Sequence, residues 1–379
     1  MRIFYLVTKS EIGGAQTHIW QLSRFMKKKG NEVGVMAFPG GWLQEKIEKL
    51  GAKFYPNYFL SNSINLIQDF KAIREIKKAV EDFKPDLISC HSTKAGFLGR
   101  LAIKNKIPTI FTAHGWAFTE GTPFLRKCLT ILLEKIAGKF CSKIICVSDF
   151  DKDLALRYKI TSLEKIVVIH NGVEILQNSE NVRTRIYEET KEKGIIKIVF
   201  IGRLAEPKDP LLLLRAFNDL STELKDKTRL SFIGEGSKRK SLEKFIRENE
   251  LEEKVKILGE IPRDKLFEVL KKFDIFVLIS NWEGFPRSIL EAMSCGLPVI
   301  VSDVGGIKEA VDENCGILVK RGDKEGIKNA LERLIKNPSL IKKMGEKAKE
   351  KVKKEFSLDK MLRETEGVYR EIILSGKIN

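Results

Sequence analysis

The segment DIFVLISNWEGFPRSILEAMSCGLPVIVS, residues 274–302, decides the fold class of this chain. It holds two apolar runs, 274–279 and 297–302, separated by a turn and by a stretch with helical spacing, 286–294. Strands that are apolar at almost every position are typical of a parallel sheet with helices on both faces. The segment therefore predicts a strand, a helix and a second strand of an α/β domain.

The same alternation extends through nearly all of the 379 residues and is interrupted by the polar stretch 177–194. At roughly 100–200 residues per domain, this length predicts two or three domains. We predict an α/β protein with two doubly wound, Rossmann-like domains that face each other across a cleft. The predicted parts are an N-terminal domain 1–175, a linker 176–195, a C-terminal domain 196–355, and a terminal helix 356–379 that packs back toward the N-terminal domain.

Charge is unevenly distributed along the chain. The whole sequence has a formal net charge of +17, and residues 1–150 alone hold 23 basic and 12 acidic residues. A basic first half predicts an anionic partner, which is a nucleic acid, an anionic membrane surface or a phosphate-bearing substrate. Because no basic stretch is interleaved with aromatic residues as in a nucleic-acid-binding module, we expect no nucleic-acid partner.

The cellular compartment is predicted from cysteines and apolar runs. Six scattered cysteines without a Cys-x-x-Cys pair predict buried free thiols in a reducing compartment. No window reaches the roughly 18 uncharged apolar residues of a membrane-spanning helix. The apolar run 3–7 is too short for a signal peptide. We therefore expect a cytoplasmic protein that binds peripherally to the inner face of the cell membrane.

Ligands of open parallel sheets bind at the carboxyl ends of the strands, so the loops after the strands are the candidate site. In the loop after 274–279, Gly284 and Pro286 shape a turn, and the helix that follows offers free N–H groups to a phosphate. Glu283 and Glu291 are suited to accept hydrogen bonds from sugar hydroxyls. Alternatively, Glu283 serves the helix dipole and Glu291 lies on a solvated helix face.

Two other loops of the second half carry glycines and cations. Gly202 leaves room beside Arg203 and Lys208, which are suited to bind a diphosphate. The alternative is that both are solvated surface cations. Gly234 ends the next strand and permits close approach of the backbone to a ligand.

The first half has two candidate loops. Gly13 and Gly14 follow the first strand and open a helix whose N–H groups can face an anion, although a tight turn also explains them. His114 stands at the end of a strand, where it can touch a ligand, and a purely structural histidine is the alternative. The remaining histidines have weaker cases: His18, His91 and His170.

Taken together, these loops resemble glycosyltransferase family 4, which consists of retaining enzymes of the GT-B fold that use nucleotide-sugar donors. The resemblance spans nearly the whole chain. It rests on Gly202-Arg203-Leu204 with Lys208, Gly234-Glu235-Gly236, Glu283-Gly284-Phe285-Pro286 with Glu291-Ala292, and Gly296-Leu297-Pro298. The segment 111–120 resembles family members that build bacterial surface polysaccharides on lipid-linked acceptors.

The resemblance implies a role for each matching residue. The cationic pair binds the donor diphosphate, the first glutamate binds the sugar hydroxyls, the second binds the ribose, and the histidine lies near the transferred sugar. The implied catalytic residues are His114, Arg203, Lys208 and Glu283. The implied donor-binding residues are Gly14, Gly202, Gly234, Gly284, Phe285, Pro286, Ser288, Ile289, Leu290 and Glu291. Our acceptor-side candidates are Gly13, Lys94, Trp116, Arg126 and Lys127, and the candidate membrane-facing cations are Lys94, Arg100, Arg126 and Lys127.

The expected reaction moves a sugar, preferably from a UDP-sugar, to a lipid-linked saccharide by displacement on the same face of the sugar. We expect no cofactor and no divalent metal, because two cations are available for the diphosphate. The stretch Asp149-Phe150-Asp151 resembles the metal motif of another glycosyltransferase fold, but acidic residues after Ser148 are typical of a first helical turn. The alternatives are a nucleotide-sugar epimerase and a glucan phosphorylase-like enzyme on the same fold, followed by a nucleic-acid-binding protein, which is the least favoured.

Overall fold

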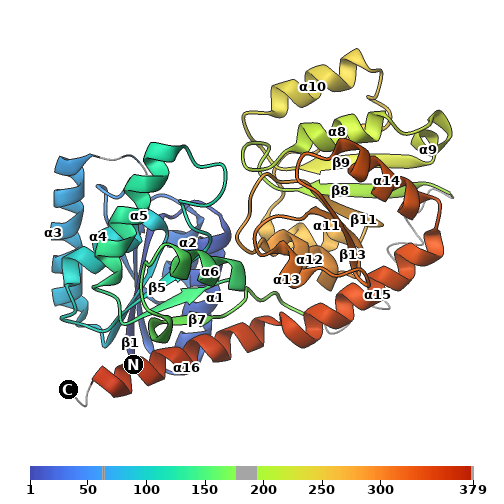
Figure 1. The fold of residues 1–379 in the computed structure, drawn as a ribbon. Helices are drawn as coiled ribbons and strands as arrows, with labels where there is room; N and C mark the ends of the chain where they lie inside the picture. Colours follow the sequence, from blue (N-terminus) through green and yellow to red (C-terminus); the bar gives the residue numbers. More distant parts are fainter. Residues whose placement is uncertain (62, 64, 176–193, 377–379) are drawn as a thin grey trace. The chain divides into compact units, whose positions relative to one another are not determined.

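The computed structural model describes residues 1–61, 63, 65–175 and 194–376, which form two compact units, each built on one parallel sheet (Figure 1). Unit 1 comprises Met1–Asn171 and Asp359–Asn379, and unit 2 comprises Gly172–Leu358. The predicted linker 176–195 lies outside the described residues except for its last two positions.

Unit 1 has a seven-stranded sheet in the order β3-β2-β1-β4-β5-β6-β7. Its strands are β1 (Arg2–Lys9), β2 (Glu32–Phe38), β3 (Lys53–Pro56), β4 (Leu87–His91), β5 (Thr109–Ala113), β6 (Lys143–Cys146) and β7 (Ile166–Val168). Its helices are α1 (Gly14–Lys28), α2 (Trp42–Lys49), α3 (Leu66–Phe83), α4 (Thr93–Ile103), α5 (Phe124–Gly138), α6 (Asp149–Arg157) and the 3-10 turn η1 (Leu163–Lys165). Five consecutive side chains of β1, residues 3–7, are fully buried, because helices cover both faces of the sheet.

Unit 2 has a six-stranded parallel sheet in the order β10-β9-β8-β11-β12-β13. Its strands are β8 (Ile196–Ile201), β9 (Thr228–Ile233), β10 (Val255–Ile257), β11 (Ile275–Leu278), β12 (Val299–Ser302) and β13 (Gly316–Val319). Its helices are α8 (Pro210–Asn218), α9 (Thr222–Asp226), α10 (Arg239–Glu248), η2 (Arg263–Lys265), α11 (Leu266–Leu270), α12 (Arg287–Ser294), α13 (Ile307–Ala310), α14 (Lys324–Ile335) and α15 (Pro338–Glu355). The prediction of two doubly wound α/β domains is confirmed.

Strand order reverses once in each unit, between β1 and β4 and between β8 and β11. Ligands of open α/β sheets bind outside the carboxyl ends of the strands at such a switch point. In unit 1, Gly13 follows β1 and His91 is the last residue of β4. In unit 2, Gly202 follows β8 and Glu283 follows β11. Each sheet therefore places predicted site residues where its topology favours a ligand.

The last helix, α16 (Leu358–Gly376), packs on unit 1. The Tyr369 hydroxyl donates to Ser89 Oγ over 2.8 Å, and Lys143 Nζ lies 3.2 Å from a carboxylate oxygen of Glu371. No helix within the described ranges is long and apolar enough to cross a membrane. Five cysteines are buried free thiols as predicted, whereas Cys128 on α5 is exposed.

Candidate active site

In unit 2, glycines allow the loops after β8 and β9 to pack closely against each other. A Cβ atom on Gly234 would lie 2.1 Å from the carbonyl oxygen of Gly202, and Gly234 has a φ of +136°. A Cβ atom on Gly236 would lie 2.4 Å from the carbonyl oxygen of Leu204. Only glycine fits at these two positions, so the backbone of the β8 loop is held in place by the β9 loop.

Lys208 and Glu283 form an ion pair that joins the loops after β8 and β11. Their side chains are 13% and 11% exposed. Lys208 Cε stands 3.5 Å from where a Cβ atom on Gly202 would be. The Asn281 amide also donates to the carbonyl oxygen of Pro207 over 2.8 Å. The structure therefore brings together the cation, the carboxylate and the glycine that the sequence singled out, while Arg203 lies exposed on the same loop.

The loop after β12 packs against the backbone of Glu283. A Cβ atom on Gly305, whose φ is +58°, would lie 1.9 Å from the carbonyl oxygen of Glu283. The Gly306 amide donates to the carbonyl oxygen of Gly284 over 3.0 Å. The glycines after β12 thus fix the turn that carries the glutamate.

Helix α12 begins at Arg287, one residue later than predicted, and Pro286 is its N-cap. Pro286 supplies no side-chain hydrogen bond to the first turn, so no side chain caps the N–H groups there. The Phe285, Ile289 and Leu290 side chains are buried, and Ser288 is half-buried. The contribution of 285, 289 and 290 to a ligand site is therefore limited to their backbone.

Glu291 is buried inside unit 2, which excludes the interpretation that it lies on a solvated helix face. Its side chain is 2% exposed, its carboxylate accepts from the Arg263 guanidinium, and it lies 3.8 Å from Nε of Arg287. Burial lowers the pKa of Arg287 to about 10, against the opposing attraction of Glu291. Neither arginine was predicted from the sequence, although Arg287 stands four residues before Glu291 and such helical positions are neighbours.

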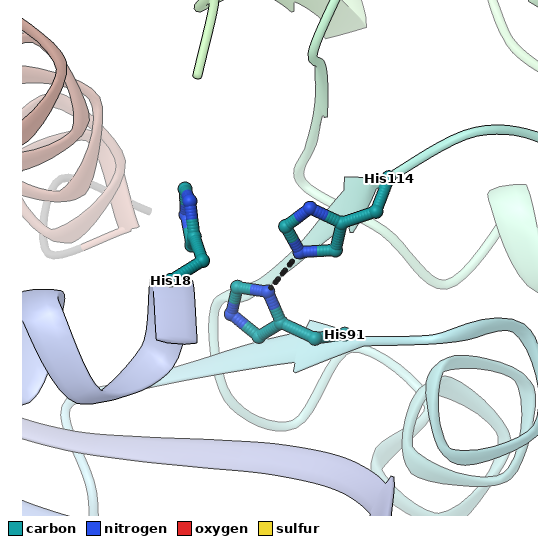
Figure 2. Close-up of side chains that lie close together, drawn as sticks. All are labelled: His18, His91 and His114. Carbon is teal, nitrogen blue, oxygen red and sulfur yellow. Dashed lines mark hydrogen bonds between the residues drawn. The ribbon is translucent and has the colours of Figure 1, made fainter. Parts of the chain in front are cut away.

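In unit 1, three histidines gather at the carboxyl end of the sheet (Figure 2). His91 Nδ1 lies 3.0 Å from Nε2 of the half-buried His114, and the two rings stack with centroids 5.3 Å apart. The His18 ring, from α1, meets the His114 ring edge-on at 4.9 Å. Burial, with a smaller contribution from His114, holds the pKa of His91 well below its usual range. His18 and His91, which were weaker candidates in the sequence, are thus direct neighbours of His114.

Two groups in unit 1 contain metal-binding residue types. Ligand nitrogens of the three clustered histidines lie within 4.8 Å of one another, close enough for one ion. In the acidic stretch, the Asp151 amide donates to Ser148 Oγ over 3.1 Å, and Ser148 Oγ donates to the Asp151 carboxylate over 2.8 Å. Asp151 is buried and serves as part of the helix cap, which supports the capping interpretation of this stretch.

At the start of α1, Gly13 is the N-cap with extended backbone and makes no side-chain capping bond, and Gly14 is the first helical residue. This loop therefore also presents an uncapped helix start.

Among the acceptor-side and membrane-facing candidates, Trp116, Arg100 and Lys94 lie in surroundings that the sequence did not indicate, and the prediction of a membrane-facing Arg100 is wrong. Trp116 is buried, and its Nε1 donates to the Asp151 carbonyl oxygen over 2.8 Å, so its ring belongs to the core. Arg100 is fully buried and bonds Glu134 over 2.7 Å, so it is no membrane-facing cation. Lys94 is 15% exposed and bonds Asp69 over 2.6 Å, which neutralises its charge.

Helix α5 carries the two other cation candidates and turns an apolar face outward. Arg126 is exposed, and Lys127 Nζ lies 5.2 Å from the ring centroid of Tyr158. Leucines and an isoleucine spaced three or four residues apart are exposed: Leu125 (82%), Leu129 (44%), Leu132 (56%) and Ile136 (38%). The buried residues of the helix are Glu134, Ala137 and Gly138.

Comparison with known proteins gives a consistent result for both halves of the chain. Residues 12–175 match Glycosyltransferase Family 4, and residues 182–351 match Glycosyl transferases group 1. The UDP-Gal:alpha-D-GlcNAc-diphosphoundecaprenol alpha-1,3-galactosyltransferase of Escherichia coli is 27% identical over 96% of this chain and 95% of its own length. An uncharacterised glycosyltransferase of Methanocaldococcus jannaschii is 30% identical over 78% of each chain.

Solved structures share the whole fold. HepE of Anabaena, in complex with UDP-glucose, superposes with a TM-score of 0.83 at 19% identity and covers 98% of this chain and 100% of its own. At this identity the likeness concerns the fold and not the chemistry.

Proposed function

Because this chain belongs to glycosyltransferase family 4, with the GT-B fold, we propose that it is a retaining transferase that moves a sugar from a nucleoside diphosphate sugar to a lipid-linked saccharide. UDP-sugars are the preferred donors in this proposal. A named relative supports that preference: the E. coli enzyme is named for UDP-Gal. The same E. coli name contains a diphosphoundecaprenol-linked sugar, which supports a lipid-linked acceptor.

The observation that carries the donor assignment is the Lys208–Glu283 pair over Gly202, beside the uncapped start of α12. A lysine, an exposed Arg203 and free helical N–H groups suit the two negatively charged phosphates of a donor. The carboxylate of Glu283 suits the hydroxyl donors of a sugar. One loop cluster therefore offers complementary groups to both parts of the ligand.

The proposed chemistry balances without a metal or a covalent intermediate. The bond between the anomeric carbon and the diphosphate oxygen breaks, and the acceptor hydroxyl oxygen bonds to the same face of that carbon. The acceptor proton passes to the leaving diphosphate, whose growing charge Arg203 and Lys208 stabilise. Glu283 binds the sugar hydroxyls and so does not act as the nucleophile. Glu291 is assigned to the ribose, and His114 to the transferred sugar.

We assign α5 to the anionic inner face of the cell membrane, where a lipid-linked acceptor resides. Its exposed apolar stripe, with Arg126 and Lys135 on the same helix, fits an interfacial helix that buries leucines below the headgroups. Co-sedimentation with vesicles that contain anionic lipid is expected, and the double change Leu125→Ser with Leu129→Ser is expected to abolish it. Leu163→Ser, at an exposed leucine on η1, is the matched control and is expected to have no effect. Equal co-sedimentation of the double variant and the wild type would contradict this assignment.

The test of the proposed function starts from a donor screen by thermal shift, since a ligand at 100 times its Kd adds about 2.7 kcal/mol of stability. The stabilising donor is then incubated with a polyprenyl-diphosphate-linked saccharide, with and without EDTA, and the product anomer is assigned by NMR. We expect transfer in EDTA with the donor's anomeric configuration kept. Inverted product, a strict requirement for Mg²⁺ or Mn²⁺, or release of nucleotide without any acceptor would contradict the proposal.

A further inference from the structure

A chain of hydrogen bonds leads inward from His114 to the terminal helix α16. His91 Nδ1 lies 3.0 Å from His114 Nε2, and His91 Nε2 lies 3.0 Å from Ser89 Oγ. The Tyr369 hydroxyl donates to the same Ser89 oxygen over 2.8 Å. Ser89, His91 and Tyr369 are 0% exposed, so bulk water does not compete for these bonds.

The direction of the protons along this chain follows from the serine. Ser89 Oγ accepts from Tyr369, and among the described residues its own hydrogen has no other acceptor than Nε2 of His91. Because its pKa lies well below the usual range, His91 is neutral and carries one hydrogen, which must then stand on Nδ1. That hydrogen is donated to His114 Nε2, so a neutral His114 keeps its own hydrogen on Nδ1.

We propose that Tyr369, Ser89 and His91 are positioning residues that hold His114 as the neutral tautomer with its hydrogen on Nδ1. The Nδ1 side of the His114 ring faces away from His91 (Figure 2). His114 thereby offers a hydrogen-bond donor without a positive charge. In sugar transfer the anomeric centre becomes positive in the transition state, so a neutral donor avoids repulsion that an imidazolium would add. This catalytic consequence rests on the proposed function, whereas the tautomer does not.

A metal ion is the competing explanation for three clustered histidines. An ion bound by His91 Nδ1 and His114 Nε2 would need a lone pair on both nitrogens, and the hydrogen bond between them would be lost. The observed 3.0 Å contact and the engaged Nε2 of His91 favour the hydrogen-bonded chain.

The direct test is long-range ¹H–¹⁵N NMR of the protein labelled with ¹⁵N-histidine, with His114→Asn and His91→Asn for assignment. In the wild type we expect the Nδ1–H tautomer at both His91 and His114. Ser89→Ala should give a mixture of tautomers at both, and Tyr369→Phe a smaller change. Thr365→Val is the matched control, because it removes a buried hydroxyl of the same helix that donates to the carbonyl oxygen of Met361 and not to Ser89. An Nε2–H tautomer at His114 in the wild type would overturn the proposal, and so would tight binding of Zn²⁺ that shifts all three histidine signals.

Measurements of kcat and KM distinguish failure of this inference from failure of the proposed function. With the donor found in the screen, Ser89→Ala should lower kcat by about 10–100-fold and leave the donor KM nearly unchanged, as for loss of an orienting hydrogen bond. Thr365→Val should keep both constants. Wild-type protein that shows the predicted tautomers but transfers no sugar would refute the proposed function alone. Active Ser89→Ala enzyme with wild-type kcat would refute the catalytic role of the chain.

Discussion

The two sheets carry different polar groups at the carboxyl ends of their central strands. At the ends of β8 and β11 in unit 2 the polar groups are charged and paired, as in Lys208 with Glu283. At the ends of β4 and β5 in unit 1 they are imidazoles, His91 and His114, and all four histidines of the chain lie in this unit. Similar strand topology therefore fixes where a ligand binds, while the loop residues decide whether the site suits an anion or a neutral polar group.

The largest expected effect concerns the one charge pair that is fully buried in unit 1 within the described residues. Arg100 and Glu134 are 0% and 1% exposed and 2.7 Å apart. Glu134→Ala leaves the guanidinium unpaired and should lower the free energy of unfolding by about 3–5 kcal/mol, measured by urea denaturation. Donor affinity, measured below the transition, should not change, because this charge is structural.

The control for that prediction is Asp82→Ala, which removes an exposed partner of Lys53 and should change stability little. Equal stability of Glu134→Ala and wild type would show that unit 1 does not depend on its buried charges.

The second largest effect is expected from removing the cations of the unit 2 site. Lys208→Ala and Arg203→Ala each remove a cation from the growing charge of the diphosphate, which typically costs about 2.7–4 kcal/mol in the barrier. We expect kcat at saturating donor to fall roughly a hundredfold or more. Lys324→Ala, which removes an exposed cation of unit 2 paired with Asp219, is the control and should keep normal turnover. If both Arg203→Ala and Lys208→Ala turn over normally, the cationic pair has no part in the reaction.

The smallest effect is expected for the histidines of unit 1, and it concerns how stability depends on pH. The folded protein holds the pKa of His91 well below the ordinary value of 6.5, so below pH 6.5 the unfolded chain takes up a proton that the folded chain does not. Stability from this group is present above pH 6.5 and is lost as the pH falls, by about 1 kcal/mol over the first pH unit. Urea denaturation at pH 6.5 and 5.5 should show this loss in the wild type and a smaller one in His91→Asn. The same loss in both proteins would mean that another group is responsible.

Local patterns were sufficient to predict the α/β fold and the loops with Gly202, Lys208 and Glu283, because apolar runs and turn glycines lie within a few residues of each other. The ion-pair partners of the buried Glu291 and Arg100 were not predicted, because they lie far away in the sequence. Arg263 and Glu134 are 28 and 34 residues away from them in sequence, and nothing local indicates such contacts.

The direction of a helix face is a second property that spacing does not determine. The apolar stripe of α5 has ordinary helical spacing, which usually indicates a buried face, yet the structure exposes it. The buried side of the helix is formed by small residues and by one charged residue, Glu134, which pairs with Arg100. Likewise, only the fold brings Tyr369 to Ser89, across 280 residues.

The most direct test of the donor site is calorimetric titration with a nucleoside diphosphate and its matching monophosphate, starting with UDP and UMP. We predict that the diphosphate binds about tenfold more tightly or better, and that Lys208→Ala removes most of the difference. Equal affinity for the two nucleotides in the wild type, or an unchanged difference in Lys208→Ala, would contradict the assignment of this loop cluster to a diphosphate.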